Sequence, residues 1–359
     1  SMSRLVGIPK PEKTGVRPIG IGEPLFKIAA ATALKKCGSE IDGFFGDKQF
    51  VLRDGGAEEI IHIVRKALRE GKVVSALDSA NAFNTIERSA IAEALYDLPA
   101  ASPLYGVFNS MYHRTSRLRV FTKDGFSDVL SQRGVRQGDP LGSVLYALGT
   151  FSVLTAAAAR HPDCKIIAFA DDIFIIAPNA ASAERCRETI AQELLLRGVS
   201  LNRQKTQTIG GDSGCDEAGL VVLGAWCGRP GSAEPFLNEK LRKYKTFFDA
   251  LDGAIEIDGE PIILPPDVRF AALSQAGHAR WTFVARTHPP EEEVMNAHRR
   301  FDEISEKSLA NIASVTSLPQ HARHIAQLPV SEGGLGLPSF ASIGGIAYGC
   351  SVGELKTDQ

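Results

Sequence analysis

A pair of adjacent aspartates between two apolar runs constrains the fold of this chain more than any other feature. The segment KIIAFADDIFIIA places Asp171 and Asp172 between two runs rich in β-branched and aromatic residues. Such runs favour strands, and only a tight turn fits between them. We therefore predict a β-hairpin with two carboxylates at its tip. Taken alone, an Asp-Asp pair is also a common hydrogen-bonding device in turns, so its chemistry depends on its surroundings.

A third carboxylate follows another short apolar run. Residues 73–78, VVSALD, predict a buried strand that ends at Asp78. If this strand lies beside the hairpin, the three carboxylates share one pocket and repel one another until a cation binds. Mg²⁺ suits such a site because it accepts a few carboxylates and completes its shell with phosphate oxygens and water. Two such ions about 3.5–4 Å apart are suited to nucleotidyl transfer.

The rest of the chain predicts an α+β protein, with an antiparallel sheet backed by helices. A hairpin is expected around 117–131, with its turn at Lys123–Gly125. Asp139 and Pro140 suit the N-cap and first position of a long helix. Beyond about residue 235 the chain looks mainly helical. The expected helices are 24–37, 57–70, 86–95, 141–159, 182–197 and 291–312, and further short strands are expected at 206–209 and 220–225.

Composition excludes several classes of protein. The net charge is −2, with 44% hydrophobic and 23% charged residues, which argues for a globular protein and against a general polyanion binder. Basic clusters at 114–123 and 240–245 suit phosphate contacts or a solvated face equally well. The six cysteines lack C-x-x-C spacing, so we expect free thiols. No apolar run approaches the ~18 residues that a membrane span needs, and no signal-peptide pattern is present, so we expect a protein that is not secreted.

Six segments, in order along residues 4–228, resemble the motifs of the reverse transcriptase family. They are IPKPEKTGVRPIGIGEPLFKI, LDSANAFNTI, RGVRQGDPLGSVLYAL, AFADDIFII, LNRQKTQ and VVLGAWCG. The run QFVLRDGGAEEIIHIVRKAL and the residues NAFN are typical of the non-LTR (LINE-type) retrotransposon branch. Group II intron enzymes share the first motif and are the nearest alternative. The resemblance implies a right-hand polymerase with fingers, a palm and a helical thumb.

The resemblance also assigns roles to individual residues. It implies that Asp78, Asp171 and Asp172, with the backbone carbonyl of Ser79, hold the metal ions. Lys205 matches a general acid that protonates leaving pyrophosphate, although a solvated lysine is the alternative. The expected nucleotide-binding residues are Lys10, Lys13, Arg17, Ser79, Ala80, Asn81, Ala82, Phe83, Gln137 and Gly138. The expected primer-binding residues are Leu223, Gly224 and Ala225.

Two of these assignments carry alternatives. Lys10 and Lys13 compete for one position in the fingers, because the register of the loop between them is open. Phe83 lies five residues after Asp78, where the family places a flat ring that rejects the ribose 2′-hydroxyl. Outside this motif, a phenylalanine is more often a core residue.

By resemblance, the chain divides into fingers (1–72), a palm with an inserted fingers hairpin at about 100–135 (73–228), a thumb (229–330) and a C-terminal extension (331–359). The implied cofactors are two Mg²⁺ ions, for which Mn²⁺ can substitute. The implied partners are an RNA template, a DNA primer and dNTPs, without a membrane and with the oligomeric state left open. The resemblance implies a nuclear or cytoplasmic location. Ser1-Met2 suits the remnant of a cleaved tag, so we expect a fragment of a longer protein.

Two other functions compete with DNA synthesis on an RNA template. A non-catalytic nucleic-acid scaffold could share the fold, because fold alone does not establish activity. The three aspartates, together with Gln137 and Lys205, argue against it. An RNA polymerase needs polar groups that accept the 2′-hydroxyl, and Phe83 argues against that function.

Overall fold

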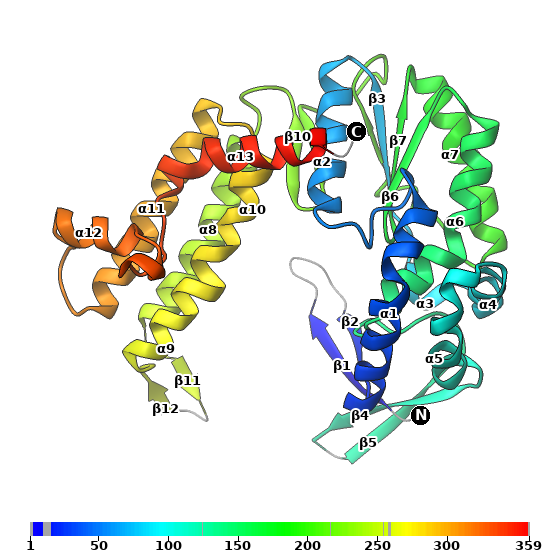
Figure 1. Ribbon diagram of the computed structural model, residues 1–359, viewed down its shortest axis with the longest axis horizontal. Helices are drawn as coiled ribbons and strands as arrows, with labels where there is room; N and C mark the ends of the chain where they lie inside the picture. The colour runs from blue at the N-terminus through cyan, green and yellow to red at the C-terminus, as the bar shows by residue number, and fades with distance from the viewer. Residues whose placement is uncertain are drawn as a thin grey trace. The chain divides into compact units, whose positions relative to one another are not determined.

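Contacts divide the chain into two compact units. The first comprises residues 1–60 and 66–216, and the second comprises residues 61–65 and 217–359. The computed structural model describes residues 3–9, 16–123, 125–215, 217–253, 255–257 and 260–357. Figure 1 shows the helices and strands, coloured from blue at the N-terminus to red at the C-terminus.

The sheet that carries the three aspartates is antiparallel, with strand order β6-β7-β3-β8. Its strands are β3 (Val73–Leu77), β6 (Lys165–Phe169), β7 (Asp172–Ala177) and β8 (Gln207–Ile209). Alternate residues such as Val73, Leu77 and Ile173 enter the core of the unit. Helices α6 (Gly142–Arg160) and α7 (Ala180–Leu196) pack against these strands (Figure 1). The predicted Asp-Asp hairpin, the strand before Asp78 and the helix-backed antiparallel sheet are therefore confirmed.

Helix α6 is the central core helix of the first unit. A Cβ at Gly149 would come within 2.9 Å of the side chains of Ile86 and Ile91, so glycine lets helix α4 (Arg88–Asp97) approach closely. With a mean hydropathy of 1.5, α6 is long and apolar enough to cross a membrane, but 67% of that window is buried inside the protein. The expectation that no segment reaches the length and hydropathy of a membrane span was therefore too strict. The burial shows why α6 passes this test as a core helix.

A second four-stranded sheet has the order β2-β1-β4-β5. Strands β1 (Ser3–Pro9) and β2 (Val16–Ile21) are antiparallel, as are β4 (Ser116–Thr122) and β5 (Gly125–Ser131). The hairpin predicted around 117–131 is confirmed. The other elements of this unit are α1 (Pro24–Phe45), α2 (Gly56–Arg69, of which 61–65 belong to the second unit), α3 (Ala82–Thr85), η1 (Pro99–Ala101) and α5 (Ser102–Tyr112).

The expected helix cap at Asp139 is wrong. Helix α6 begins at Gly142, and its N-cap residue is Leu141. Asp139 Oδ2 accepts a hydrogen bond from the buried Tyr112 hydroxyl, and Oδ1 accepts one from Leu141 N–H at 3.0 Å. Asp139 therefore does not cap the helix. One of its carboxylate oxygens closes the turn before α6, and the other binds the hydroxyl of Tyr112, which is distant in sequence.

The second unit is mainly helical, as expected beyond residue 235. Its helices are α8 (Glu234–Asp252), α9 (Pro266–Ala271), α10 (Ala279–Thr287), α11 (Glu292–Ile312), α12 (Gln320–Gln327) and α13 (Phe340–Thr357), with a π-helical turn η2 (Ala272–His278) and a 3-10 turn η3 (Val330–Glu332). Trp281 stacks on Phe301 at 4.5 Å in its core. Strands β11 (Ile255–Ile257) and β12 (Glu260–Ile262) form a short hairpin that the sequence analysis missed.

The strand expected at 220–225 is instead two strands and a turn. Strand β9 (Gly219–Val222) pairs with β10 (Ala225–Gly228), and Leu223 and Gly224 connect them. Both connecting residues have positive φ, 47° and 88°. A leucine in this conformation is uncommon, so the apolar pattern of this segment predicted one continuous strand.

Candidate active site

The three aspartates meet at one end of the sheet in the first unit. Phe169 pairs with Asp172 across the β6–β7 turn, and Leu77 pairs with Ile173. Continuing that register by one residue sets Asp78 opposite Asp172 on the same face of the sheet. Asp171 lies in the turn itself. The structure therefore brings the three carboxylates together, as the sequence predicted.

Burial and neighbouring charges raise the pKa values of two of the three carboxyls. Burial is the main cause that raises the pKa of Asp172 to about 6, and the charges of Asp171 and Asp78 contribute to this rise. Burial also raises the pKa of Asp171, with a smaller contribution from Asp78. Asp172 nevertheless keeps exposed surface, so ions and substrate can reach it. Negative charge is thus concentrated at this end of the sheet.

Lys205 is the cation beside this cluster. Its Nζ lies 3.4 Å from Asp78 Oδ2, with both side chains partly exposed. The backbone explains the position: Asn202 N–H donates to Asp78 O at 2.7 Å, and Lys205 N–H donates to Asn202 O at 3.2 Å. The segment LNRQKTQ is therefore fixed to the residue that carries the first carboxylate.

The three carboxylates suit divalent ions whose coordination is completed by oxygen atoms of the substrate. Among the described residues, no three His, Cys, Asp or Glu side chains are placed to hold an ion by themselves. Mg²⁺ is usually held by one or two carboxylates and completed by phosphate oxygens and water. Asp78 Oδ2 is buried and accepts no hydrogen bond within the described chain. A carboxylate oxygen that accepts no hydrogen bond, beside two carboxyls of raised pKa, matches that partial coordination.

Phe83 lies at the edge of this site and is held from two sides. Its ring stacks on buried Tyr146 at 5.2 Å, and its carbonyl accepts a hydrogen bond from Val135 N–H at 2.7 Å. Burial and the charge of Asp171 raise the pKa of Tyr146, which places its hydroxyl in the field of the carboxylates. The sequence analysis missed Tyr146, because an aromatic residue in an apolar helix looks like ordinary core.

The residues between Asp78 and Phe83 differ in exposure. Ser79 forms an antiparallel bridge with Leu201, and Ala80 N–H donates to Ser200 O at 2.8 Å. Asn81 is exposed with φ of 51°, whereas Ala82 is buried in the core. Ala82, with 2% of its surface exposed, therefore offers almost no surface to a nucleotide.

Gln137 and Gly138 are held against strand β2. Gly20 N–H donates to Gln137 O at 2.7 Å, and Gln137 forms a parallel bridge with Ile19. Arg17 lies two residues before Ile19 on strand β2 and is exposed. The structure thus brings Arg17, Gln137 and Gly138 into one region. Lys10 and Lys13 lie outside the described residues.

The expected primer-binding residues lie in the second unit. Leu223 and Gly224 form the β9–β10 turn, and Ala225 is the buried first residue of β10. Their assignment stays a prediction.

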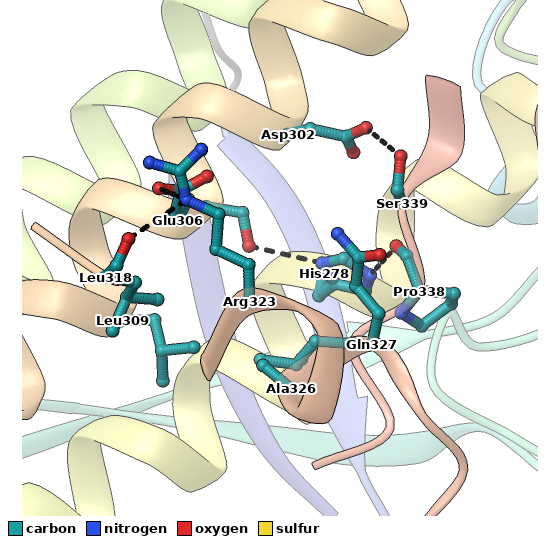
Figure 2. A pocket seen from close by; sticks show the side chains of 12 residues that line it. His278, Asp302, Glu306, Leu309, Leu318, Arg323, Ala326, Gln327, Pro338 and Ser339 are labelled. Carbon is teal, nitrogen blue, oxygen red and sulfur yellow. Dashed lines mark hydrogen bonds and ion pairs between the residues drawn. The ribbon is translucent and has the colours of Figure 1, made fainter. Parts of the chain in front are cut away.

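A pocket of about 50 Å³ in the second unit is lined by residues including His278, Asp302 and Arg323 (Figure 2). His278 Nε2 bonds Pro338 O at 2.9 Å, and Nδ1 bonds Ser305 Oγ at 3.2 Å. Asp302 accepts from Ser339 Oγ and from two backbone N–H groups at the start of α13. His278 and Asp302 thus form hydrogen bonds within the protein, so we interpret the pocket as a structural cavity.

Comparison with known proteins decides the family. The profile of the family described as reverse transcriptase (RNA-dependent DNA polymerase) matches residues 8–225. This chain belongs to the reverse transcriptase family. The match confirms the predicted polymerase domain and its fold class.

Curated relatives of this reverse transcriptase domain are retrotransposon proteins. The 132 kDa protein of the retrotransposable element SLACS, from Trypanosoma brucei gambiense, is 29% identical over 96% of this chain and 29% of its own length. The Pol polyprotein of the R2 element from Popillia japonica is 25% identical over 54% of this chain and 29% of its own length. The predicted non-LTR branch is thereby confirmed. The chain spans less than a third of the length of these relatives.

Among solved structures, apo telomerase from Candida tropicalis has a TM-score of 0.49 and 12% identity over 88% of this chain and 62% of that chain. Telomerase from Candida albicans, solved with a fragment of telomeric RNA, has a TM-score of 0.48 and 12% identity over 87% of this chain and 61% of that chain.

Proposed function

We propose that this domain extends a DNA primer from its 3′-hydroxyl with deoxynucleotides on an RNA template. The observation that carries the proposal is the convergence of Asp78, Asp171 and Asp172 at one end of the sheet in a reverse transcriptase domain. The raised pKa values of Asp171 and Asp172, to which burial contributes most and the neighbouring carboxylates add, support a site that attracts cations.

Asp78, Asp171 and Asp172 would hold two Mg²⁺ ions, with the Ser79 carbonyl as a further ligand. When bound, the ions supply charge neutralisation at the triphosphate and activate the 3′-hydroxyl. The protein's own part is positioning, because phosphoryl transfer requires little covalent chemistry from side chains. The sheet serves this role, since the paired strands β3, β6 and β7 hold the ends of the chain segments that carry the aspartates.

Phe83 would select the sugar, because a rigid ring stacked on Tyr146 cannot yield to a 2′-hydroxyl without disturbing a buried residue. Gln137 and Gly138 would line the nucleotide, and Arg17 would bind its phosphates in a bidentate manner. Lys205, whose ammonium group lies at the edge of the carboxylates, would protonate leaving pyrophosphate. Leu223, Gly224 and Ala225 would support the primer through backbone contacts.

We assign fingers to residues 1–72, the palm to 73–228, the thumb to 229–330 and a C-terminal extension to 331–359. The similarity to SLACS and R2 proteins supports a role of the parent protein in retrotransposition.

Primer extension on an RNA template, with Mg²⁺ and dNTPs, tests the proposal. Asp171→Asn should abolish extension while primer–template binding persists. The control Asp97→Asn removes a carboxylate from an exposed site at the end of α4 and should extend like the wild type. Extension with ribonucleotides alone would indicate an RNA polymerase. No extension by a folded wild-type protein that binds primer–template would favour a scaffold.

A further inference from the structure

The segment before helix α2 contacts the strand that leads to the catalytic hairpin. Phe50 N–H donates to Ala168 O at 2.8 Å, and Ala168 N–H donates to Lys48 O at 2.8 Å. Gln49 thereby forms a parallel bridge with Ala168 along the edge of strand β6. The sequence motif QFVLRDGG, which the proposed mechanism leaves unused, supplies this segment.

The turn of the hairpin contains an unusual backbone conformation. Ala170 precedes Asp171 and has φ of 52°. Phe169 and Asp172 pair on either side, so Ala170 is the first residue of a two-residue turn. Turns with positive φ at this position usually have glycine there, because a Cβ is unfavourable. Something outside the turn must hold Ala170 in place.

The side chain of Gln49 supplies that support. Its Oε1 accepts a hydrogen bond from Ala170 N–H at 2.9 Å, and its Nε2 donates to Ala170 O at 3.1 Å. Gln49 is fully buried, with 0% of its surface exposed. One amide thus satisfies both polar groups of the strained residue, without competition from water.

The contact acts directly on the first aspartate of the pair. Ala170 O and Asp171 N belong to one planar peptide group, so fixing the oxygen fixes the N–H. Gln49 therefore acts on the backbone of Asp171 through the peptide plane that Ala170 and Asp171 share.

We infer that Gln49 is a positioning residue for the metal-binding aspartates: it holds Ala170 in the left-handed conformation and so sets the direction of Asp171 and Asp172. The inference rests on the proposed function of those aspartates. Gln49 itself touches neither metal nor substrate in this scheme.

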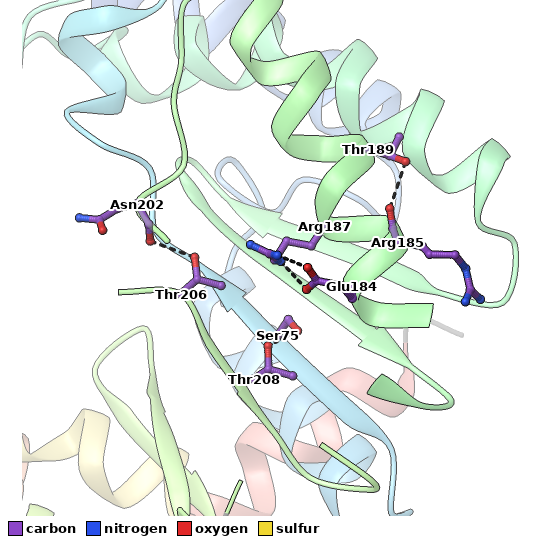
Figure 3. A network of polar contacts seen from close by, with 8 residues as sticks. All are labelled: Ser75, Glu184, Arg185, Arg187, Thr189, Asn202, Thr206 and Thr208. Atoms are coloured by element: carbon purple, nitrogen blue, oxygen red, sulfur yellow. Dashed lines mark hydrogen bonds and ion pairs between the residues drawn. The ribbon is translucent and has the colours of Figure 1, made fainter. Parts of the chain in front are cut away.

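The test compares Gln49→Met with a control in the same sheet. Methionine keeps the length of the side chain but leaves both Ala170 groups unpaired. The control is Ser75→Ala, because buried Ser75 bonds Thr208 at 2.7 Å between β3 and β8, away from the turn (Figure 3). The readouts are kcat and KM for primer extension, the melting temperature, and Mn²⁺ affinity by electron paramagnetic resonance, with and without a dideoxy-terminated primer–template and dNTP.

Gln49→Met should lower kcat and Mn²⁺ affinity by about 10- to 100-fold, the usual effect of losing a group that orients metal ligands. Its KM for primer–template should stay near the wild-type value. Ser75→Ala should lower the melting temperature but change kcat by less than about twofold, as expected for distant, independent sites.

A rescue variant separates positioning from general destabilisation. Glycine adopts positive φ readily. Adding Ala170→Gly to Gln49→Met should therefore recover part of the lost kcat and Mn²⁺ affinity. A loss of folding stability alone would not be repaired in this way.

Unchanged kcat and Mn²⁺ affinity in folded Gln49→Met would overturn the inference, as would a failure of Ala170→Gly to restore either. If Gln49→Met does not fold, Gln49→Asn, which keeps a polar amide one methylene short of Ala170, carries the same prediction. If the wild type extends no primer, the proposed function fails, while Mn²⁺ affinity of the protein alone still decides the role of Gln49.

Discussion

Replacing Asp172 with asparagine should stabilise the metal-free protein while removing its activity. Burial, followed by the charges of Asp171 and Asp78, raises the Asp172 pKa from 3.8 to about 6. Between these values the folded protein binds more protons than the unfolded chain, so its stability falls as pH rises through that window. Above about pH 6 the ionised Asp172 carboxylate destabilises the folded protein by its full amount. Asparagine removes this destabilisation because it carries no charge.

The size of the effect follows from the same shift. Raising the pKa from 3.8 to about 6 corresponds at most to about 3 kcal/mol, at ~1.36 kcal/mol for each pH unit. Asp172 is exposed, so solvent screening reduces this to on the order of 1 kcal/mol. For a unit of this size, that corresponds to a rise in melting temperature of about 2–4 °C.

Thermal unfolding in EDTA at pH 8 and at pH 4 measures this change in melting temperature. Asp172→Asn should melt higher than the wild type at pH 8, and the gain should vanish near pH 4. Asp97→Asn, which removes an equal charge from an exposed position, controls for net charge. A gain no larger than that of Asp97→Asn, or a lower melting temperature at pH 8, would refute the claim that the ionised Asp172 side chain destabilises the folded, metal-free protein.

Three further predictions test the neighbouring residues. Phe83→Ala should raise the relative use of ribonucleotides by about 10- to 200-fold, measured as the ratio of kcat/KM values, and unchanged selectivity would remove the sugar-gate assignment. Gly138→Ala should impair dNTP incorporation, because φ is 95° and the new Cβ would lie 3.0 Å from Ile19 Cγ2, whereas Gly43→Ala, with no atom within 4 Å, should be neutral in the same assay. Lys205→Gln should lower kcat about 100-fold with little change in KM, and an unaltered kcat in single-turnover measurements would make Lys205 an ordinary surface lysine.

Local sequence patterns were sufficient for the elements that carry the aspartates. The apolar runs on either side of Asp171-Asp172 predicted β6 and β7, because their pattern and the tight turn are local properties. Helix α11 and the β4–β5 hairpin were predicted for the same reason. The motif around Asp78 then needed only an adjacent strand to complete the site.

Contacts between distant residues escaped prediction. Gln49 and Ala170 are 121 residues apart, and their hydrogen bonds leave no periodic signal in either segment. The stack of Phe83 on Tyr146 is equally non-local. Asp139 was misassigned because its cap-like sequence context is local, whereas its partner Tyr112 is not. The sequence therefore predicted which carboxylates the sheet brings together better than it predicted which residues hold them in place.

The central claim is that the three aspartates form one divalent-metal site that substrate completes. A Mn²⁺ titration by electron paramagnetic resonance, without and with dNTP and a dideoxy-terminated primer on an RNA template, tests it most directly. The account predicts weak binding to the protein alone, tight binding of two ions in the complex with substrates, and loss of that tight binding in Asp171→Asn. Equal Mn²⁺ binding by the wild type and Asp171→Asn in the presence of substrates would contradict it.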